Sequence, residues 1–158
     1  VAQDEPGELL IKGPGVMKGY LNRPTETEET LKGGWLHTGD IARMDEDGYI
    51  YIVDRKKDLI IRGGYNVYPR EIEEVIYQIP EILETAVIGL PHTDLGEEIM
   101  AIVVLNNGAE IKEDDIRDFV KQRVAPYKYP RVIQIRQEPL PKSGTGKILK
   151  KEIKNSID

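Results

Sequence analysis

DRKKD, at residues 54–58, places five charged side chains in a row between two apolar segments, YIYIV at 49–53 and LII at 59–61. Because five consecutive charges cannot lie in a hydrophobic core, this run marks a boundary or a hinge. We therefore expect residues 1–54 to be the β-rich end of a large N-terminal domain. Residues 55–158 are expected to form a complete, small C-terminal domain.

The segment before the charged run has the pattern of a small antiparallel β structure. GELLIK at 7–12 is typical of a strand, and PTETEETL at 24–31 of a short helix, since Pro and Glu favour a first helical turn. The dipeptide Asp47-Gly48 predicts a hairpin turn between an extended segment at 35–44 and the alternating residues 49–53.

The segment after the run alternates short strands with amphipathic helices. Apolar residues spaced three and four apart predict helices at 69–78, 113–124 and 147–157. Short apolar runs predict strands at 59–61, 84–90, 99–105 and 131–136. The pattern predicts an α+β domain with a central three-stranded sheet and flanking helices.

Composition narrows the kinds of site that the chain can contain. It has no cysteine, which excludes disulfides, thiolate metal sites and cysteine nucleophiles, and two histidines, which exclude a histidine-rich metal site. No apolar run approaches the roughly 20 residues of a membrane span. We expect a cytoplasmic protein without a transmembrane segment, and peripheral membrane contact is left open. The sequence begins with Val1 rather than Met, which indicates a piece of a longer chain.

The net charge of −6 is unevenly distributed, with acidic residues predominating up to residue 116 and basic residues beyond it. A basic end can attract a polyphosphate, although a solvated surface gives the same pattern. The basic residues are not interleaved with aromatic side chains and the chain as a whole is acidic. We therefore expect no nucleic-acid partner.

PKSGTGK, at 141–147, is the sharpest local motif. Two glycines let backbone amides approach a ligand, and the predicted helix that starts at Lys147 favours an anion at its N-terminus. This placement lets Lys147 reach a phosphate or a carboxylate; the alternative is a flexible surface turn with a solvated lysine. The motif is not a Walker A loop, because Pro141 stands where its first glycine would be and Ile148 where its Ser/Thr would be.

Two further motifs suggest ligand contacts. Asp40 and Arg55 flank the predicted hairpin, whose two ends lie side by side, so they are placed to bind one ligand together. A carboxylate at a strand end can accept hydrogen bonds from sugar hydroxyls; a salt bridge between Asp40 and Arg55 is the alternative. Gly63-Gly64 joins a strand to a helix and permits close passage of a ligand, or forms a simple turn.

The order and spacing of these motifs resemble the adenylate-forming superfamily, which contains acyl-CoA synthetases, luciferases and the adenylation domains of peptide synthetases. The resemblance covers essentially the whole chain. The wording GGYNVYPREIEE, at 63–74, is most similar to the long- and medium-chain fatty-acid–CoA ligases. The motifs that carry the resemblance are WLHTGD at 35–40, DRKKD at 54–58, GGYNVYPREIE at 63–73 and PKSGTGK at 141–147.

The resemblance implies a two-step reaction with ATP, CoA and a carboxylic acid as substrates. The acid attacks the α-phosphate of ATP to give an acyl-adenylate, the small domain then rotates, and the thiol of CoA displaces AMP. By position, the resemblance assigns adenylation to Lys147, ribose binding to Asp40 and Arg55, the hinge to Lys57, and the pantetheine passage to Gly64. Gly63 and Tyr65, on either side of Gly64, are expected to be cofactor-binding residues as well.

The resemblance also implies that this chain is half of an active site. The phosphate loop, the acyl pocket and the Mg²⁺ site are expected in the missing N-terminal domain, so the chain alone is not expected to be fully active. The alternatives are an aryl-CoA ligase, a luciferase-like adenylating enzyme, or a non-catalytic module that docks CoA or a carrier protein. The presence of Asp40 and Lys147 argues against the last, because a binding module needs neither.

Overall fold

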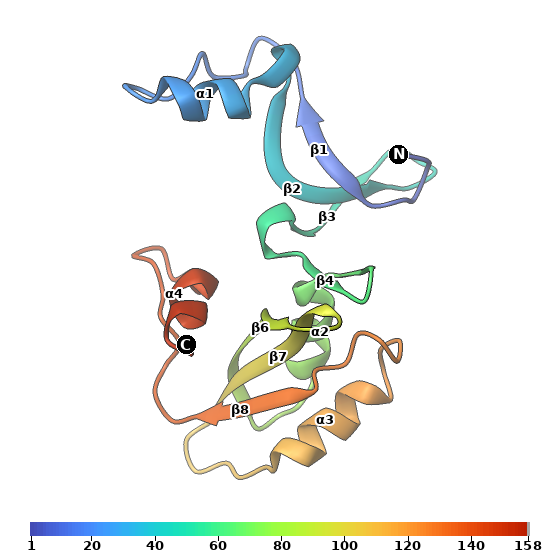
Figure 1. Cartoon of the computed structure of the whole chain (residues 1–158), viewed down its shortest axis with the longest axis vertical. Coiled ribbons are helices and arrows are strands. Elements are labelled where there is room, and N and C mark those ends of the chain that lie inside the picture. The colour runs from blue at the N-terminus through green and yellow to red at the C-terminus, as the bar shows by residue number, and fades with distance from the viewer. Residues whose placement is uncertain (158) are drawn as a thin grey trace. The chain divides into compact units, whose positions relative to one another are not determined.

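The computed structural model describes residues 1–157, and the chain divides into two compact units, Val1–Lys57 and Asp58–Asp158 (Figure 1). The charged run predicted a boundary after Asp54. The division falls later because a strand continues through Arg55 and is followed by a short 3-10 helix, Lys56–Asp58. The first charges of the DRKKD run therefore complete a strand of the first unit.

The first unit is built on a three-stranded antiparallel sheet with β2 in the centre. Its elements are β1 (Gly7–Ile11), α1 (Pro24–Thr30), η1 (Lys32–Gly34), β2 (Leu36–Met44) and β3 (Ile50–Arg55), and the division between the units falls within η2 (Lys56–Asp58). The turn between β2 and β3 is fixed by Asp45, whose carboxylate accepts hydrogen bonds from the amides of Asp47 and Tyr49. Its apolar core is small, since Ile41 and Ala42 are its only buried hydrophobic residues in the described part of the chain.

The second unit is an α+β domain, as the sequence predicts. Its elements are β4 (Ile60–Arg62), β5 (Tyr65–Val67), α2 (Pro69–Ile76), β6 (Ile82–His92), β7 (Gly96–Leu105), α3 (Glu113–Lys121), β8 (Val132–Arg136) and α4 (Lys150–Asn155). Strand β6 pairs with β7 along its whole length, so β4 and β8 share the other edge of β7. Strand β8 runs parallel to β7, and α3 lies between them in the chain.

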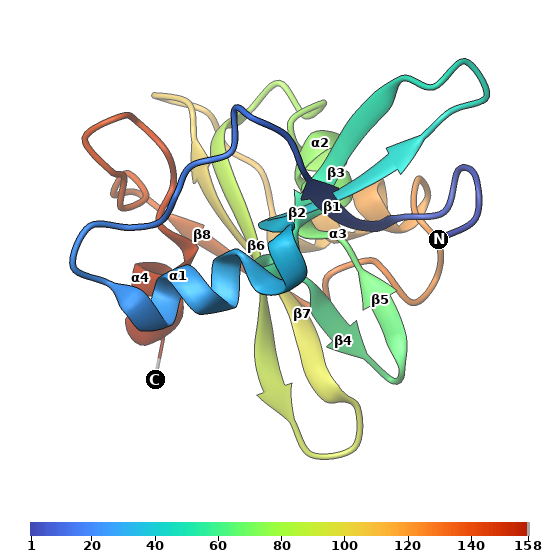
Figure 2. The same cartoon turned by 90° about the horizontal axis from the view of Figure 1, so that it is seen from above.

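Strand β7 supplies both cores of this unit, because its successive side chains point to opposite faces. Ile99, Ala101 and Val103 pack with residues of α2 and α3, whereas Met100, Ile102 and Val104 pack with Leu140 and with Ile153 of α4. Figure 2 shows α4 on one side of the sheet and α2 and α3 on the other. Burial on both faces explains why residues 99–105 (IMAIVVL) are apolar without alternation.

The sheet of the second unit has five strands, not the predicted three. The predicted strands at its centre are present as β6, β7 and β8, and the β4–β5 hairpin extends it. Gly63 and Gly64, with φ of 56° and 82°, form the two-residue turn of that hairpin, in which Arg62 pairs with Tyr65. The sequence-based prediction took these glycines as a link from strand to helix and so missed β5.

The last helix is also shorter than predicted. It spans Lys150–Asn155 rather than 147–157, because the preceding residues form a hairpin in which Lys142 pairs with Ile148. Lys147 therefore lies in the hairpin and does not open a helix. The prediction that a helix N-terminus at Lys147 attracts an anion is wrong.

Among residues 1–157, no helix combines the length and the apolar character that crossing a membrane requires.

Candidate functional site

Asp40 and Arg55 lie opposite each other on β2 and β3 and form an ion pair, with 3.0 Å between Asp40 Oδ1 and Arg55 Nε. Their side chains are 29% and 41% exposed. Each uses one polar atom in this pair, and within residues 1–157 their remaining side-chain nitrogens and oxygen make no other hydrogen bond. The pair can thus hold its geometry and still offer an acceptor and two donors to a polar ligand.

The backbone before Asp40 is held in place by Thr38. The Thr38 hydroxyl donates to the carbonyl of Leu9 on β1 and accepts a hydrogen bond from the Asp40 amide. Gly39, between them, has a φ of 72°, a conformation that favours glycine. The TGD sequence therefore fixes the direction in which the carboxylate leaves the strand.

Glu8, on β1 of the first unit, is a charged residue that the sequence-based prediction did not single out. Its carboxylate accepts hydrogen bonds from Lys56 Nζ at 2.8 Å and from His37 Nδ1 at 3.3 Å. The hydrogen bond from Lys56 is the main reason that the pKa of Glu8 lies below its ordinary value. Lys56 is thereby tied to the sheet, whereas its neighbour Lys57 is exposed and makes no side-chain hydrogen bond or ion pair within residues 1–157.

The Gly63-Gly64 turn is anchored from β7 and from the loop before it. The amide of Gly63 donates to the carbonyl of Leu95, and the amide of Ile61 donates to Glu97 Oε2, both at 2.8 Å. A methyl group on Gly64 would meet no heavy atom of residues 1–157 within 4 Å beyond its two chain neighbours, so glycine is required there by its φ rather than by space. The outer side of the turn is open in this unit.

Tyr65 follows the turn and stacks on Tyr127, with 4.7 Å between the ring centroids and 27° between the ring planes. It remains 58% exposed. One ring face is therefore used in packing within the unit while much of the side chain stays accessible beside the glycines.

Arg62 and Glu98 form a largely buried ion pair beside the same turn, in which both Arg62 Nε and Nη2 donate to the carboxylate at 2.7 and 3.0 Å. Burial alone would raise the pKa of Glu98. The hydrogen bonds from Arg62 and from the Ile99 amide outweigh it and hold that pKa below its ordinary value.

This pair leads to a pH prediction. Because the folded pKa of Glu98 is depressed, its contribution to stability is complete above its ordinary value of 4.5 and is lost as pH falls through the folded pKa. Glu98→Gln should lower the melting temperature of the full-length protein at neutral pH. As the pH is lowered, the melting temperature of this variant should fall less than that of the wild type. The measurement is thermal unfolding at pH values from about 7 down to about 3. Glu138→Gln, at an exposed position, is the control; an undiminished acid dependence in Glu98→Gln would contradict the assignment.

Lys147 lies at the end of a tight hairpin. The amide of Gly146 donates to the carbonyl of Ser143, and the amide of Ser143 donates to the carbonyl of Lys147, at 2.9 and 2.8 Å. With Gly146 at a φ of 82°, this is a three-residue hairpin loop ending in a glycine bulge. The backbone at Lys147 is ordered, while its side chain is exposed and makes no hydrogen bond or ion pair within residues 1–157.

The base of this hairpin is held by Glu84 of β6, which is 9% exposed. One carboxylate oxygen accepts a hydrogen bond from the amide of Leu140 at 2.9 Å, and the other accepts one from Lys142 Nζ. Burial alone would raise the pKa of Glu84, but these contacts outweigh it and lower the pKa. The sequence gives one signal for this role, since Glu84 is a charged residue near the start of the mostly apolar strand β6.

Glu73 of α2 is largely buried, with 16% of its side chain exposed. Its Oε1 accepts a hydrogen bond from the amide of Val87 at 2.8 Å and pairs with Lys150 Nζ at 2.7 Å. Lys150 is therefore engaged with Glu73 in this structure. The contact ties α4 to α2 and β6.

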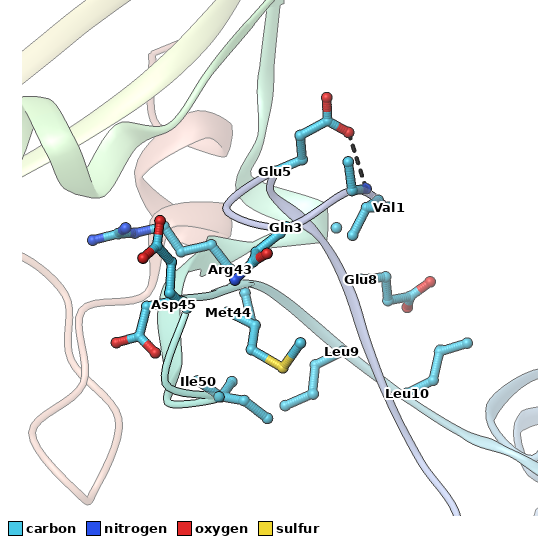
Figure 3. Close-up of a pocket in the computed structure, with 15 residues that line it drawn as sticks. Val1, Gln3, Glu5, Glu8, Leu9, Leu10, Arg43, Met44, Asp45 and Ile50 are labelled. Carbon is cyan, nitrogen blue, oxygen red and sulfur yellow. Dashed lines mark hydrogen bonds between the residues drawn. The ribbon is translucent and has the colours of Figure 1, made fainter.

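A cavity of about 400 Å³ lies in the first unit, between β1 and the β2–β3 turn (Figure 3). Leu9, Met44 and Ile50 give it apolar walls, and Arg43 and Asp45 stand at its polar side. None of the residues that the sequence singled out for function lines it. Those residues lie instead at three places: on β2, β3 and η2, on the β4–β5 hairpin, and on the Lys142–Ile148 hairpin.

The described residues offer no metal site: within residues 1–157, no three His, Asp or Glu side chains are arranged to hold an ion. That Mg²⁺ is held by the N-terminal domain stays a prediction.

Comparison with known proteins gives three similarities and a family match. Residues 71–147 match the AMP-binding enzyme C-terminal domain. The chain is 50% identical over 149 residues to a long-chain-fatty-acid–CoA ligase of Bacillus subtilis (strain 168), covering 94% of this chain and 26% of that protein. It is 45% identical over 154 residues to a feruloyl-CoA synthase of Amycolatopsis sp, covering 98% of this chain and 31% of that one.

Among solved structures, the chain resembles ATP-bound MatB from Rhodopseudomonas palustris, with a TM-score of 0.91 and 38% identity over 99% of this chain and 31% of that one. The chain therefore spans between about a quarter and a third of the length of these three relatives.

Proposed function

Because residues 71–147 of this chain belong to the AMP-binding enzyme C-terminal domain family, we propose that the chain is the C-terminal part of an ATP-dependent acyl-CoA ligase for long-chain fatty acids. The observation that carries the substrate class is the 50% identity to a long-chain-fatty-acid–CoA ligase over 94% of the chain. The rest of the enzyme, with the acyl pocket, is the partner that this chain requires.

In the first half-reaction, a carboxylate oxygen of the acid attacks the α-phosphorus of ATP and the bond to pyrophosphate breaks. The paired carboxylate and guanidinium of Asp40 and Arg55 bind the ribose hydroxyls through the polar atoms that they do not share with each other. Lys147 stabilises the negative charge that builds at the phosphorus, because its ammonium carries the opposite charge and can approach the reacting groups.

In the second half-reaction, the thiol of CoA attacks the acyl carbonyl and AMP leaves. The open outer side of the Gly63-Gly64 turn, with the exposed Tyr65 beside it, suits the passage of a narrow pantetheine arm. The tethers of this turn to Leu95, Glu97 and Glu98 support this role, because a rigid turn keeps the passage free of mobile side chains.

Lys57 is the proposed pivot between the two half-reactions. It lies where the contact pattern divides the chain into two units. Its side chain makes no ion pair or hydrogen bond within residues 1–157, so dihedral changes there break no side-chain contact of its own.

A second candidate is a ligase for aromatic acids, which the 45% identity to a feruloyl-CoA synthase favours. The two candidates share every proposed residue role and differ only in the acyl pocket.

The test is ATP–pyrophosphate exchange by the full-length protein across a panel of carboxylic acids. Long-chain fatty acids should stimulate exchange at least about tenfold more than ferulate or short acids, since an apolar pocket discriminates by about that factor or more. A preference for ferulate would support the aromatic-acid ligase instead. No exchange with any acid would overturn the proposed function. The isolated chain 1–158 is the control and should give no exchange.

A further inference from the structure

The proposed function gives Lys147 the central chemical role. Its side chain is exposed and unpaired within residues 1–157, so the protein directs its ammonium through the backbone that carries it. That backbone is the hairpin from Lys142 to Ile148. What holds this hairpin therefore decides where the ammonium can go.

Three sets of polar contacts define the hairpin, and Ile148 packs against the core cluster that contains Leu140 and Ile153. Its tip is closed within itself by Ser143, whose hydroxyl lies 2.9 Å from that of Thr145 and accepts a hydrogen bond from the Lys147 amide at 3.2 Å. Its two strands are joined by the Leu149 amide, which donates to the carbonyl of Pro141 at 2.8 Å. Neither set connects the hairpin to the body of the unit.

Glu84 supplies the polar connection to that body. It stands on β6 and grips the incoming strand of the hairpin at two points, the amide of Leu140 and the ammonium of Lys142. Leu140, 3% exposed, is embedded in the core cluster that contains Ile153 of α4. The start of the hairpin is thus fixed on the sheet, and the contacts of the Glu84 carboxylate set the direction in which the hairpin projects.

We propose that Glu84 is a positioning residue for Lys147, whose carboxylate fixes the base of the hairpin so that the ammonium is presented to the α-phosphate in the adenylation step. This inference rests on the proposed function. It assigns a role to a charged group that stability alone does not require, because a buried ion pair often stabilises a fold no more than an apolar packing of the same volume.

The ion pair of Lys150 with Glu73 does not serve the same purpose. It joins α4 to α2 and β6 beyond the end of the hairpin. Breaking it would loosen the helix without releasing Lys142. Glu84 and Lys142 are therefore the pair whose removal alters the hairpin most directly.

The experiment compares both half-reactions in the full-length enzyme. Glu84→Gln keeps the shape and an acceptor for the Leu140 amide but removes the charge that holds Lys142. We expect kcat for ATP–pyrophosphate exchange to fall by about 10- to 100-fold with little change in KM for ATP, since small misplacement of a catalytic group costs that much. Thioester formation from pre-made acyl-adenylate should stay at the wild-type rate.

Lys142→Gln removes the other partner of the same ion pair. The Lys142 side chain is 38% exposed, so this variant should fold and gives a second test if Glu84→Gln does not fold. It should produce the same selective loss, and the double variant should be no slower than either single one. The matched control is Glu71→Gln, which removes a Lys–Glu pair with Lys128 away from this hairpin and should leave exchange unchanged.

Two outcomes overturn the inference. Equal losses in both half-reactions would indicate a structural role for Glu84, and wild-type exchange in both Glu84→Gln and Lys142→Gln would indicate none. Lys147→Ala in the same assay separates this failure from failure of the proposed function. If Lys147→Ala abolishes exchange while the Glu84 and Lys142 variants do not, only the positioning role is lost.

Discussion

Lys147→Ala in the full-length enzyme is expected to slow acyl-adenylate formation by about 100- to 1,000-fold, the usual loss when one charge-stabilising donor is removed from a transition state. The expectation follows from the exposed, unpaired ammonium at the end of an ordered hairpin. Because the side chain makes no hydrogen bond or ion pair within residues 1–157, its removal should leave the melting temperature unchanged. Stopped-assay measurement of pyrophosphate release gives the rate.

The same variant should form thioester from pre-made acyl-adenylate at close to the wild-type rate, since that step builds no new charge on phosphorus. Lys112→Ala is the matched control, because Lys112 is another exposed lysine of the same unit whose side chain makes no hydrogen bond or ion pair within residues 1–157. Equal losses in the two half-reactions would show that Lys147 is not specific to adenylation.

Lys57→Pro should have the opposite effect, sparing adenylation and slowing CoA transfer by about 100-fold or more, as expected when a required conformational step is blocked. Lys57 lies in the 3-10 helix Lys56–Asp58, and helices of this type have φ values close to the roughly −65° that proline imposes. The substitution is thus compatible with this conformation and resists any rotation that needs another φ. Single-turnover assays of each half-reaction measure the split.

Glu46→Pro is the control for the presence of a new proline. Glu46 is the second residue of the β2–β3 turn, in which the amide of Gly48 donates to the carbonyl of Asp45, and proline suits that position. Both half-reactions should be unaffected. If Lys57→Pro transfers acyl groups to CoA at the wild-type rate, the pivot lies elsewhere in the chain.

Much of the fold could be predicted from apolar patterning alone. Strands β6 and β7 and helices α2 and α3 were predicted because each buries a regular set of Ile and Val side chains, and such a set is visible in the sequence. Strand β5 was missed because three residues carry too little periodicity. The start of α4 was misplaced because the spacing of Leu149, Ile153 and Ile157 is helical, whereas the hydrogen bonds that end the hairpin are not visible in a sequence.

The candidate site divides in the same way. A turn at Asp47-Gly48 fixes which residues of a hairpin face each other, so the neighbourhood of Asp40 and Arg55 could be inferred from local sequence alone. The contact of Glu84 with Lys142 could not, because it joins residues far apart in the chain through the fold of the whole unit. The functional roles of these residues remain predictions, which assays of the two half-reactions decide.

The pairing of β7 with β6 on one edge and β8 on the other also sets the order in which this unit can assemble. Strands β6 and β7 are joined by the short loop Thr93–Leu95, so closing their ladder costs little chain entropy. Strand β8 docks only after the chain has crossed through α3, and the Lys142–Ile148 hairpin comes later still. During synthesis on the ribosome, β6 and β7 therefore emerge before Lys147, the lysine proposed for catalysis.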